Sequence, residues 1–123
     1  MLLTTNKRKG DEMMHAKNGI RMALRDYAKF HEMFDELKPL TQAMYGLLNE
    51  AIRQCGLNEA ETLVVNHRYI SPTDIDRQVE SCSIETGLPE RTVKYHSASV
   101  LDKIHAYMNE HGEAYYARHN IRL

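Results

Sequence analysis

The sequence predicts an all-α protein of about five helices, and three observations support this prediction. Apolar residues recur at steps of three and four over most of the chain, which is the spacing of one helix face. The alternation of apolar and polar residues that marks a strand is absent. Residues that end helices, namely Pro39, Gly56, Gly87 and Gly112, separate the periodic stretches. At 123 residues the chain is one domain, or one small domain with an appended segment, and it can bury a modest core.

The first half of the chain is predicted to form a helical hairpin. A first helix is expected from Asp11, with firm structure from about Ile20. Pro39 interrupts it and suits the first turn of a second helix, which Gly56 should end in the left-handed conformation. Residues 20–52 contain more apolar residues than helices that cover one small domain need to bury. This excess predicts self-association, for which a symmetric homodimer is the default.

Three further helices are predicted in the second half. Asn58 is a good N-cap residue, and Glu61 three residues later completes a capping box. The letters "SPTD" at residues 71–74 indicate the next helix start, with a capping serine, a proline in the first turn and an aspartate near the positive end of the dipole. Gly87 ends that helix, and the last helix is expected over residues 88–109.

These last three helices have the order of a helix-turn-helix, with a longer final helix after a tight turn at a glycine. The segment "LPERTVKYHSASVLDKI" resembles the recognition segment of LuxR-type regulators and is similar to region 4 of bacterial sigma factors. With "RYI" before it and "TD" opening the middle helix, the chain resembles phage late-gene regulators of the ArpU and RinA type. The resemblance covers residues 57–108. It implies a sigma-like helix-turn-helix and a sequence-specific, DNA-binding transcriptional regulator encoded by a phage or prophage.

The predicted organisation has four parts. Residues 1–10 are a flexible tail, 11–56 a helical oligomerisation or partner segment, 57–110 the helix-turn-helix domain, and 111–123 a C-terminal tail or short helix after a break at Gly112.

The final helix is expected to bury one face and to present the other to DNA. Val93, Val100, Leu101 and Ile104 are spaced to pack inward. On the remaining positions, Arg91 could read a guanine bidentately, and Thr92, Lys94 and Ser97 could bind phosphate. The predicted DNA-binding residues are Arg91, Thr92, Lys94, Tyr95, His96, Ser97 and Ser99.

The charge of the chain leaves three functions open. Residues 58–107 carry 5 Lys+Arg against 8 Asp+Glu, whereas residues 1–57 carry 9 against 7. An acidic module should bind double-stranded DNA weakly by itself, because affinity depends on neutralising phosphates. Dimerisation could compensate, or the fold could contact RNA polymerase or another regulator instead. A structural helical phage protein is the third alternative. A basic stripe through Arg91 and Lys94 would favour DNA, and an exposed apolar stripe along Met33, Phe34 and Met44 would favour a protein partner.

Other classes of function have little support in the sequence. Cys55 and Cys82 form no CxxC pair, and the histidine spacings match no zinc pattern, so neither a metal nor another cofactor is expected. No nucleophile elbow, phosphate loop or paired acidic motif indicates an enzyme. No apolar run has the length of a membrane span, and the start lacks the pattern of a signal peptide. A cytoplasmic protein is therefore expected.

Overall fold

The structure, a computed structural model, describes residues 16–121, and these residues are all helical or loop, with no strand. The prediction of an all-α fold with about five helices is thus confirmed, whereas the expected tail over residues 1–10 lies outside the described residues. The six α-helices of the described part are α2 (Lys17–Arg25), α3 (Tyr27–Glu32), α4 (Pro39–Gln54), α5 (Glu59–Val65), α6 (Gln78–Thr86) and α7 (Glu90–Arg118). A 3-10 turn (Phe34–Glu36) and a π-helical turn (Asn66–Ile70) complete them.

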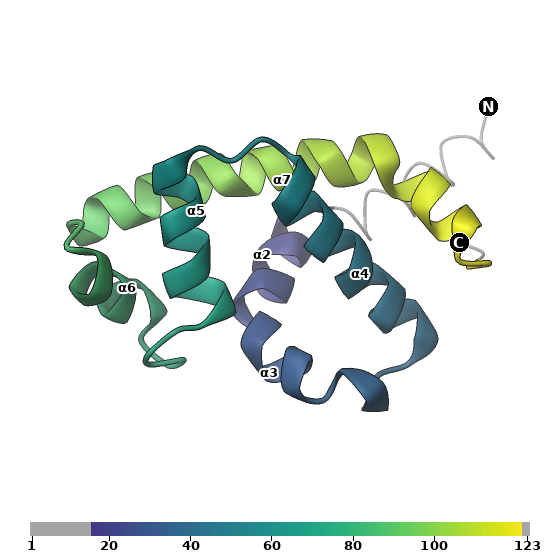
Figure 1. Cartoon of the computed structure of the whole chain (residues 1–123), viewed down its shortest axis with the longest axis horizontal. Coiled ribbons are helices and arrows are strands. Elements are labelled where there is room, and N and C mark those ends of the chain that lie inside the picture. Colours follow the sequence, from purple (N-terminus) through teal and green to yellow (C-terminus); the bar gives the residue numbers. More distant parts are fainter. Residues whose placement is uncertain (1–15, 122–123) are drawn as a thin grey trace.

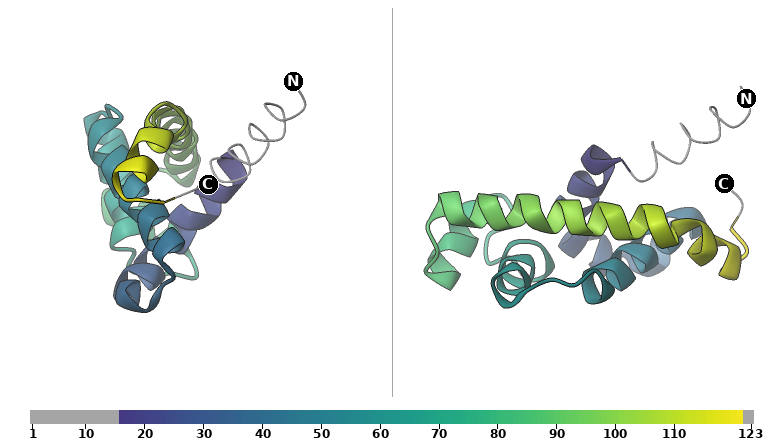
Figure 2. Two further views of the ribbon diagram at one scale, coloured as in Figure 1. Left: turned by 90° about the vertical axis from the view of Figure 1, so that its right-hand side faces the viewer. Right: turned by 90° about the horizontal axis from the view of Figure 1, so that it is seen from above.

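Helix α7 is the longest helix described, and the other helices lie along it (Figure 1). Its 29 residues make it about 43 Å long at 1.5 Å per residue. Helices α5 and α6 pack against its N-terminal half, and α4 packs against its C-terminal half. Helix α2 also contacts α7, and its first turn projects on the side of α7 away from α5 (Figure 2).

The N-terminal helices and α7 share one hydrophobic core. Ile20 and Leu24 of α2, Leu47 and Leu48 of α4, and Ile104 of α7 are all at most 2% exposed and belong to one cluster. Most of the apolar side chains over residues 20–52, which predicted self-association, are therefore buried in the core of the same chain. The large apolar side chains left exposed in that segment are Met22, Met33 and Leu40, which lie on separate parts of it.

Several local signals act as predicted. Pro39 is the first residue of α4, and Gly56 follows that helix with a φ of 81°. Asn58 caps α5 by accepting a hydrogen bond from the backbone N–H of Glu61, whose carboxylate accepts from the backbone N–H of Asn58 in return. Gly87 ends α6 in the left-handed conformation, with a φ of 75°.

The predicted helix start at residues 71–74 is wrong, because α6 begins only at Gln78. The preceding segment is a loop in which the Asp74 carboxylate accepts a hydrogen bond from the backbone N–H of Asp76. Such side-chain bonds to nearby backbone compete with helix formation. The hydroxyl of Thr73 donates to Glu85 and ties this loop to α6.

The predicted break at Gly112 is also wrong, since α7 continues through this buried glycine to Arg118. Glycine costs a helix roughly 1 kcal/mol relative to alanine. The two tyrosines beyond it, Tyr115 and Tyr116, are 8% and 1% exposed in the main core, and their burial outweighs that cost. The tyrosine hydroxyl of Tyr115 lies against Gly46 of α4 at a point that leaves no room for a Cβ atom.

Candidate nucleic-acid interface

Helices α5, α6 and α7 are held together by a small second core. Val64 of α5, Cys82 of α6 and Val93 of α7 are fully buried together, and burial raises the pKa of the Cys82 thiol. The turn at Gly87 is braced by the Ser83 hydroxyl, which donates to the backbone carbonyl of Leu88 over 2.6 Å. The first turns of α7 are therefore fixed relative to α5 and α6.

One face of the first turns of α7 is open to solvent. Arg91, Lys94, Tyr95 and Ala98 are exposed on it, and Tyr95 is 71% exposed. These positions recur at steps of three and four, so they share one side of the helix. The predicted inward residues, Val93, Val100, Leu101 and Ile104, are all buried on the opposite side, as expected.

Two of the predicted DNA-binding residues are not on that open face. Ser97 is 6% exposed, and its hydroxyl donates to the backbone carbonyl of Val93 over 2.7 Å. The Ser99 hydroxyl donates to the carboxylate of Glu61 on α5. Helix periodicity put Ser99 on the outward face, and Ser97 was expected to bind phosphate, but both hydroxyls have partners inside the protein. Both assignments are therefore corrected.

Thr92 and His96 occupy an intermediate position. Both are partly exposed, and helix periodicity puts them on the same flank of α7 as Ser99, which contacts α5. The His96 ring lies edge-on to the Tyr95 ring, with centroids 5.4 Å apart. Of the predicted set, the structure brings Arg91, Lys94 and Tyr95 together on the open face.

A buried carboxylate joins α5 to α7 behind the open face. Glu61 is 1% exposed and accepts hydrogen bonds from the Lys103 ammonium at 2.6 Å, from Ser99 and from the backbone of Asn58. Burial raises the pKa of this carboxyl, but the hydrogen bonds and the positive charge of Lys103 outweigh it and lower the pKa to about 2. The sequence showed the capping role of Glu61 but not its partners on α7.

A positively charged cleft of about 340 Å³ adjoins the open face of α7. It lies between α2, the π-helical turn and α7, and its cationic lining residues are Lys17, Arg21, Arg68 and Lys94. Asp102 is the one carboxylate among its lining residues, and it pairs with Lys17 over 2.6 Å. This cleft was not predicted from the sequence. Its only signal was the four-residue step from Lys17 to Arg21, which puts both on one face of a helix.

Arg68 is held by an aromatic ring rather than by a carboxylate. Its guanidinium lies 4.9 Å from the centre of the Tyr69 ring, and its buried Nε–H has no hydrogen-bond acceptor among residues 16–121. A buried donor without a partner costs about 1–3 kcal/mol. Arg68 belongs to the π-helical turn after α5, and such turns occur frequently at functional sites.

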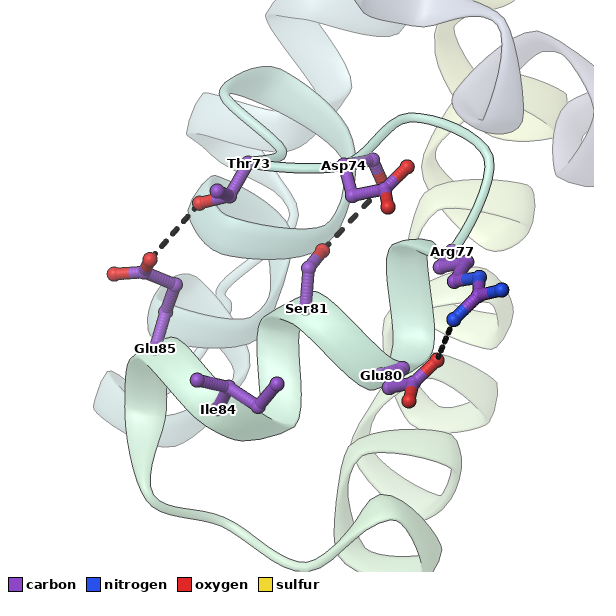
Figure 3. A pocket seen from close by; sticks show the side chains of 7 residues that line it. All are labelled: Thr73, Asp74, Arg77, Glu80, Ser81, Ile84 and Glu85. Atoms are coloured by element: carbon purple, nitrogen blue, oxygen red, sulfur yellow. Dashed lines mark hydrogen bonds and ion pairs between the residues drawn. The ribbon is translucent and has the colours of Figure 1, made fainter.

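The surface of α6 is acidic, in contrast to the positively charged cleft beside α7 (Figure 3). A shallow pocket there is lined by the acidic residues Asp74, Glu80 and Glu85, with Arg77 paired to Glu80 over 3.7 Å. Ile84 lies among them and is 76% exposed. These charges would repel phosphate, so a DNA contact is favoured on α7 and the cleft rather than on this surface.

The apolar stripe that would indicate a protein partner is largely absent from the surface. Phe34 and Met44 are partly buried and pack against the main core, and Met33 is 37% exposed. The criterion of an exposed apolar stripe along Met33, Phe34 and Met44 is therefore not met in the described part of the chain.

Neither a metal site nor a membrane span is found in the described part of the chain. Within residues 16–121 no three His, Cys, Asp or Glu side chains gather where they could share a metal ion. None of the helices described has the length and apolar character needed to cross a bilayer. Comparison with known proteins finds no matching family model, no matching curated protein and no matching solved structure.

Proposed function

We propose that this protein is a sequence-specific DNA-binding regulator of transcription, which inserts the first turns of α7 into the major groove. The observation that carries the proposal is the open face of α7, on which Arg91, Lys94 and Tyr95 stand together above a braced turn. A recognition helix contacts base edges with its N-terminal residues, and these side chains are in that part of α7. The resemblance to phage regulators with a sigma-like helix-turn-helix supports the same proposal.

The local chemistry suits groove recognition. An arginine side chain can donate two hydrogen bonds to one guanine, and a lysine can neutralise a phosphate. Arg91 and Lys94 are both exposed, and neither pairs with a carboxylate among the described residues. They are therefore free to exchange counter-ions for DNA phosphates or bases without breaking an internal contact.

Arg91→Ala and Lys94→Ala are expected to affect DNA binding in different ways. Loss of Arg91 should cost about 1–3 kcal/mol and relax the preference at one base position. Loss of Lys94 should weaken binding to all sequences alike and reduce the salt dependence by about one unit. The measurement is selection of duplexes from a random pool, followed by titration of the selected duplex at two salt concentrations.

Arg53→Ala is the matched control, because Arg53 is exposed near the end of α4 and away from the open face of α7. It should bind like the wild-type protein. Both α7 variants should keep the wild-type melting temperature, since their side chains do not pack in the core. If the wild-type protein selects no sequence even at low salt, the DNA-binding proposal is wrong.

The exposed Ile84 supports a second candidate, a helix-turn-helix module that binds RNA polymerase or another regulator. An apolar side chain that is 76% exposed among carboxylates is a poor contact for DNA and a good one for a protein. Under this alternative, Ile84→Ser should abolish co-elution with purified bacterial RNA polymerase and leave DNA affinity unchanged. If co-elution is absent in the wild type or persists in the variant, this candidate loses its support.

A further inference from the structure

The charged cleft beside α7 combines residues from three separate parts of the chain. Lys17 and Arg21 come from α2, Arg68 from the π-helical turn and Lys94 from α7. With Asp102 as the single carboxylate in the lining, the cleft has a surplus of three positive charges. A concentration of like charge on a concave surface attracts anions, because the surrounding low-dielectric protein focuses the field.

Three of the four cations lack an internal counter-charge. Within residues 16–121, Arg21, Arg68 and Lys94 form no ion pair with a carboxylate, whereas Lys17 pairs with Asp102. Arg21 instead donates to the side chain of Asn18. A guanidinium without a carboxylate partner, held against a ring as Arg68 is, can still offer its donors to a planar or tetrahedral oxyanion.

The position of the cleft beside the open face of α7 indicates which anion it binds. Lys94 and Ala98 line the cleft and also belong to the open face of α7, so the two surfaces are continuous. The start of α2 flanks α7 on the side away from α5 (Figure 2). A helix inserted in the major groove has a phosphate strand on each side of it, because the groove is only about 12 Å wide. One of those strands would pass over the cleft.

We propose that this cleft is a phosphate-binding site that holds the DNA backbone beside α7, with Arg21 and Arg68 as its principal ligands. This inference rests on the proposed function and identifies the source of the positive charge that the helix-turn-helix segment lacks. Residues 58–107 carry three more acidic than basic side chains, and α2 supplies two of the cleft's cations from outside that segment. Phosphate contacts of this kind set the register of a protein on DNA without reading its sequence.

Arg21→Gln, Arg68→Gln and the double variant test the site, with Arg53→Gln as the matched control on α4. The double variant is expected to bind the selected duplex and a random duplex at least about tenfold more weakly at low salt, with unchanged sequence preference. Its salt slope should fall by about two units, at 0.9 unit per phosphate contact. Arg21 is exposed, so the Arg21→Gln variant keeps the test valid even if the Arg68 substitution perturbs folding.

A second titration follows the arginine Nε–Hε resonances by NMR, first with inorganic pyrophosphate and then with the duplex. Both ligands are expected to shift the Arg68 signal and leave the Arg53 signal in place. If the duplex binds but the variants match Arg53→Gln in affinity and salt slope, the inference is wrong and the proposed function stands. If pyrophosphate shifts Arg68 but no duplex binds, the cleft serves a free phosphoryl anion, and both DNA proposals are overturned. If neither ligand shifts Arg68, the phosphate site does not exist.

Discussion

A chain that ends at Glu110 is expected to lose cooperative folding. Such a chain keeps the whole predicted helix-turn-helix segment but removes Tyr115 and Tyr116, which pack into the main core from the last turns of α7. Deleting one buried aromatic side chain typically costs about 3–5 kcal/mol. Two such losses, taken as an upper bound, are comparable with the whole stability of about 5–15 kcal/mol of a typical domain.

Urea unfolding followed by circular dichroism measures this effect. The control is a chain that ends at Ile121, which keeps both tyrosines and the hydrogen bond from the Ile121 N–H to the Tyr116 carbonyl. It should unfold like the full chain, whereas the shorter chain should show a shallow transition or none. An unchanged midpoint for the chain ending at Glu110 would mean that residues 111–123, predicted from the sequence as a C-terminal tail or short helix, are dispensable for folding.

Glu61→Ala is expected to destabilise the protein by about 3–5 kcal/mol at neutral pH. The substitution removes a buried carboxylate together with the hydrogen bonds that it accepts from Lys103 and Ser99, and a hydrogen bond to a charged group contributes about 1.5–3 kcal/mol. It also removes half of the capping box of α5. Glu59→Ala is the matched control, since Glu59 is exposed in the same first turn of α5, and it should cost less than about 1 kcal/mol. The measurement is the free energy of unfolding from urea titration.

The same carboxylate predicts an acid-dependent loss of stability. The pKa of Glu61 is about 2 in the folded protein against 4.5 in the reference state, so the folded state favours the ionised form. The stabilisation is therefore complete above pH 4.5 and is lost as the pH falls from there toward 2. At 1.36 kcal/mol per pKa unit it amounts to about 3 kcal/mol.

Glu61→Gln separates this charge effect from the loss of shape. The variant has no ionisable group at position 61, so its stability should fall less steeply than that of the wild type over this pH interval. The difference between the two unfolding free energies should therefore narrow as the pH falls. Parallel curves would show that another group causes the acid sensitivity.

The helix ends that were correctly predicted depend on residues within one turn of each other. Pro39, Gly56, Gly87 and the pair Asn58–Glu61 each act on the backbone beside them, through a fixed φ, a left-handed conformation or a side-chain cap. These effects are local, so the sequence is enough to predict them. The inward face of α7 was predictable for a similar reason, since helix geometry fixes which residues share a side.

The failed predictions arise where local preferences were close to balance. At residues 71–74 a capping signal and a loop-forming aspartate compete, and hydrogen bonds to Asp76 and Glu85 favour the loop. At Gly112 a helix-breaking preference of roughly 1 kcal/mol is set against burial of two tyrosines by helices from the other half of the chain. The outcome in each case depends on partners that are not adjacent in the sequence.

The sequence alone determined that the chain is helical, where several of the helices begin or end, and that Arg91, Lys94 and Tyr95 share a face of the last helix. Tertiary packing decided which of the neighbouring side chains remain available, because Ser97 became buried and Ser99 bound Glu61. Packing also brought Lys17 and Arg21 next to Lys94, although more than seventy positions separate them in the chain. Net charge counted along a sequence cannot show this, since the field that an anion meets depends on distances through space.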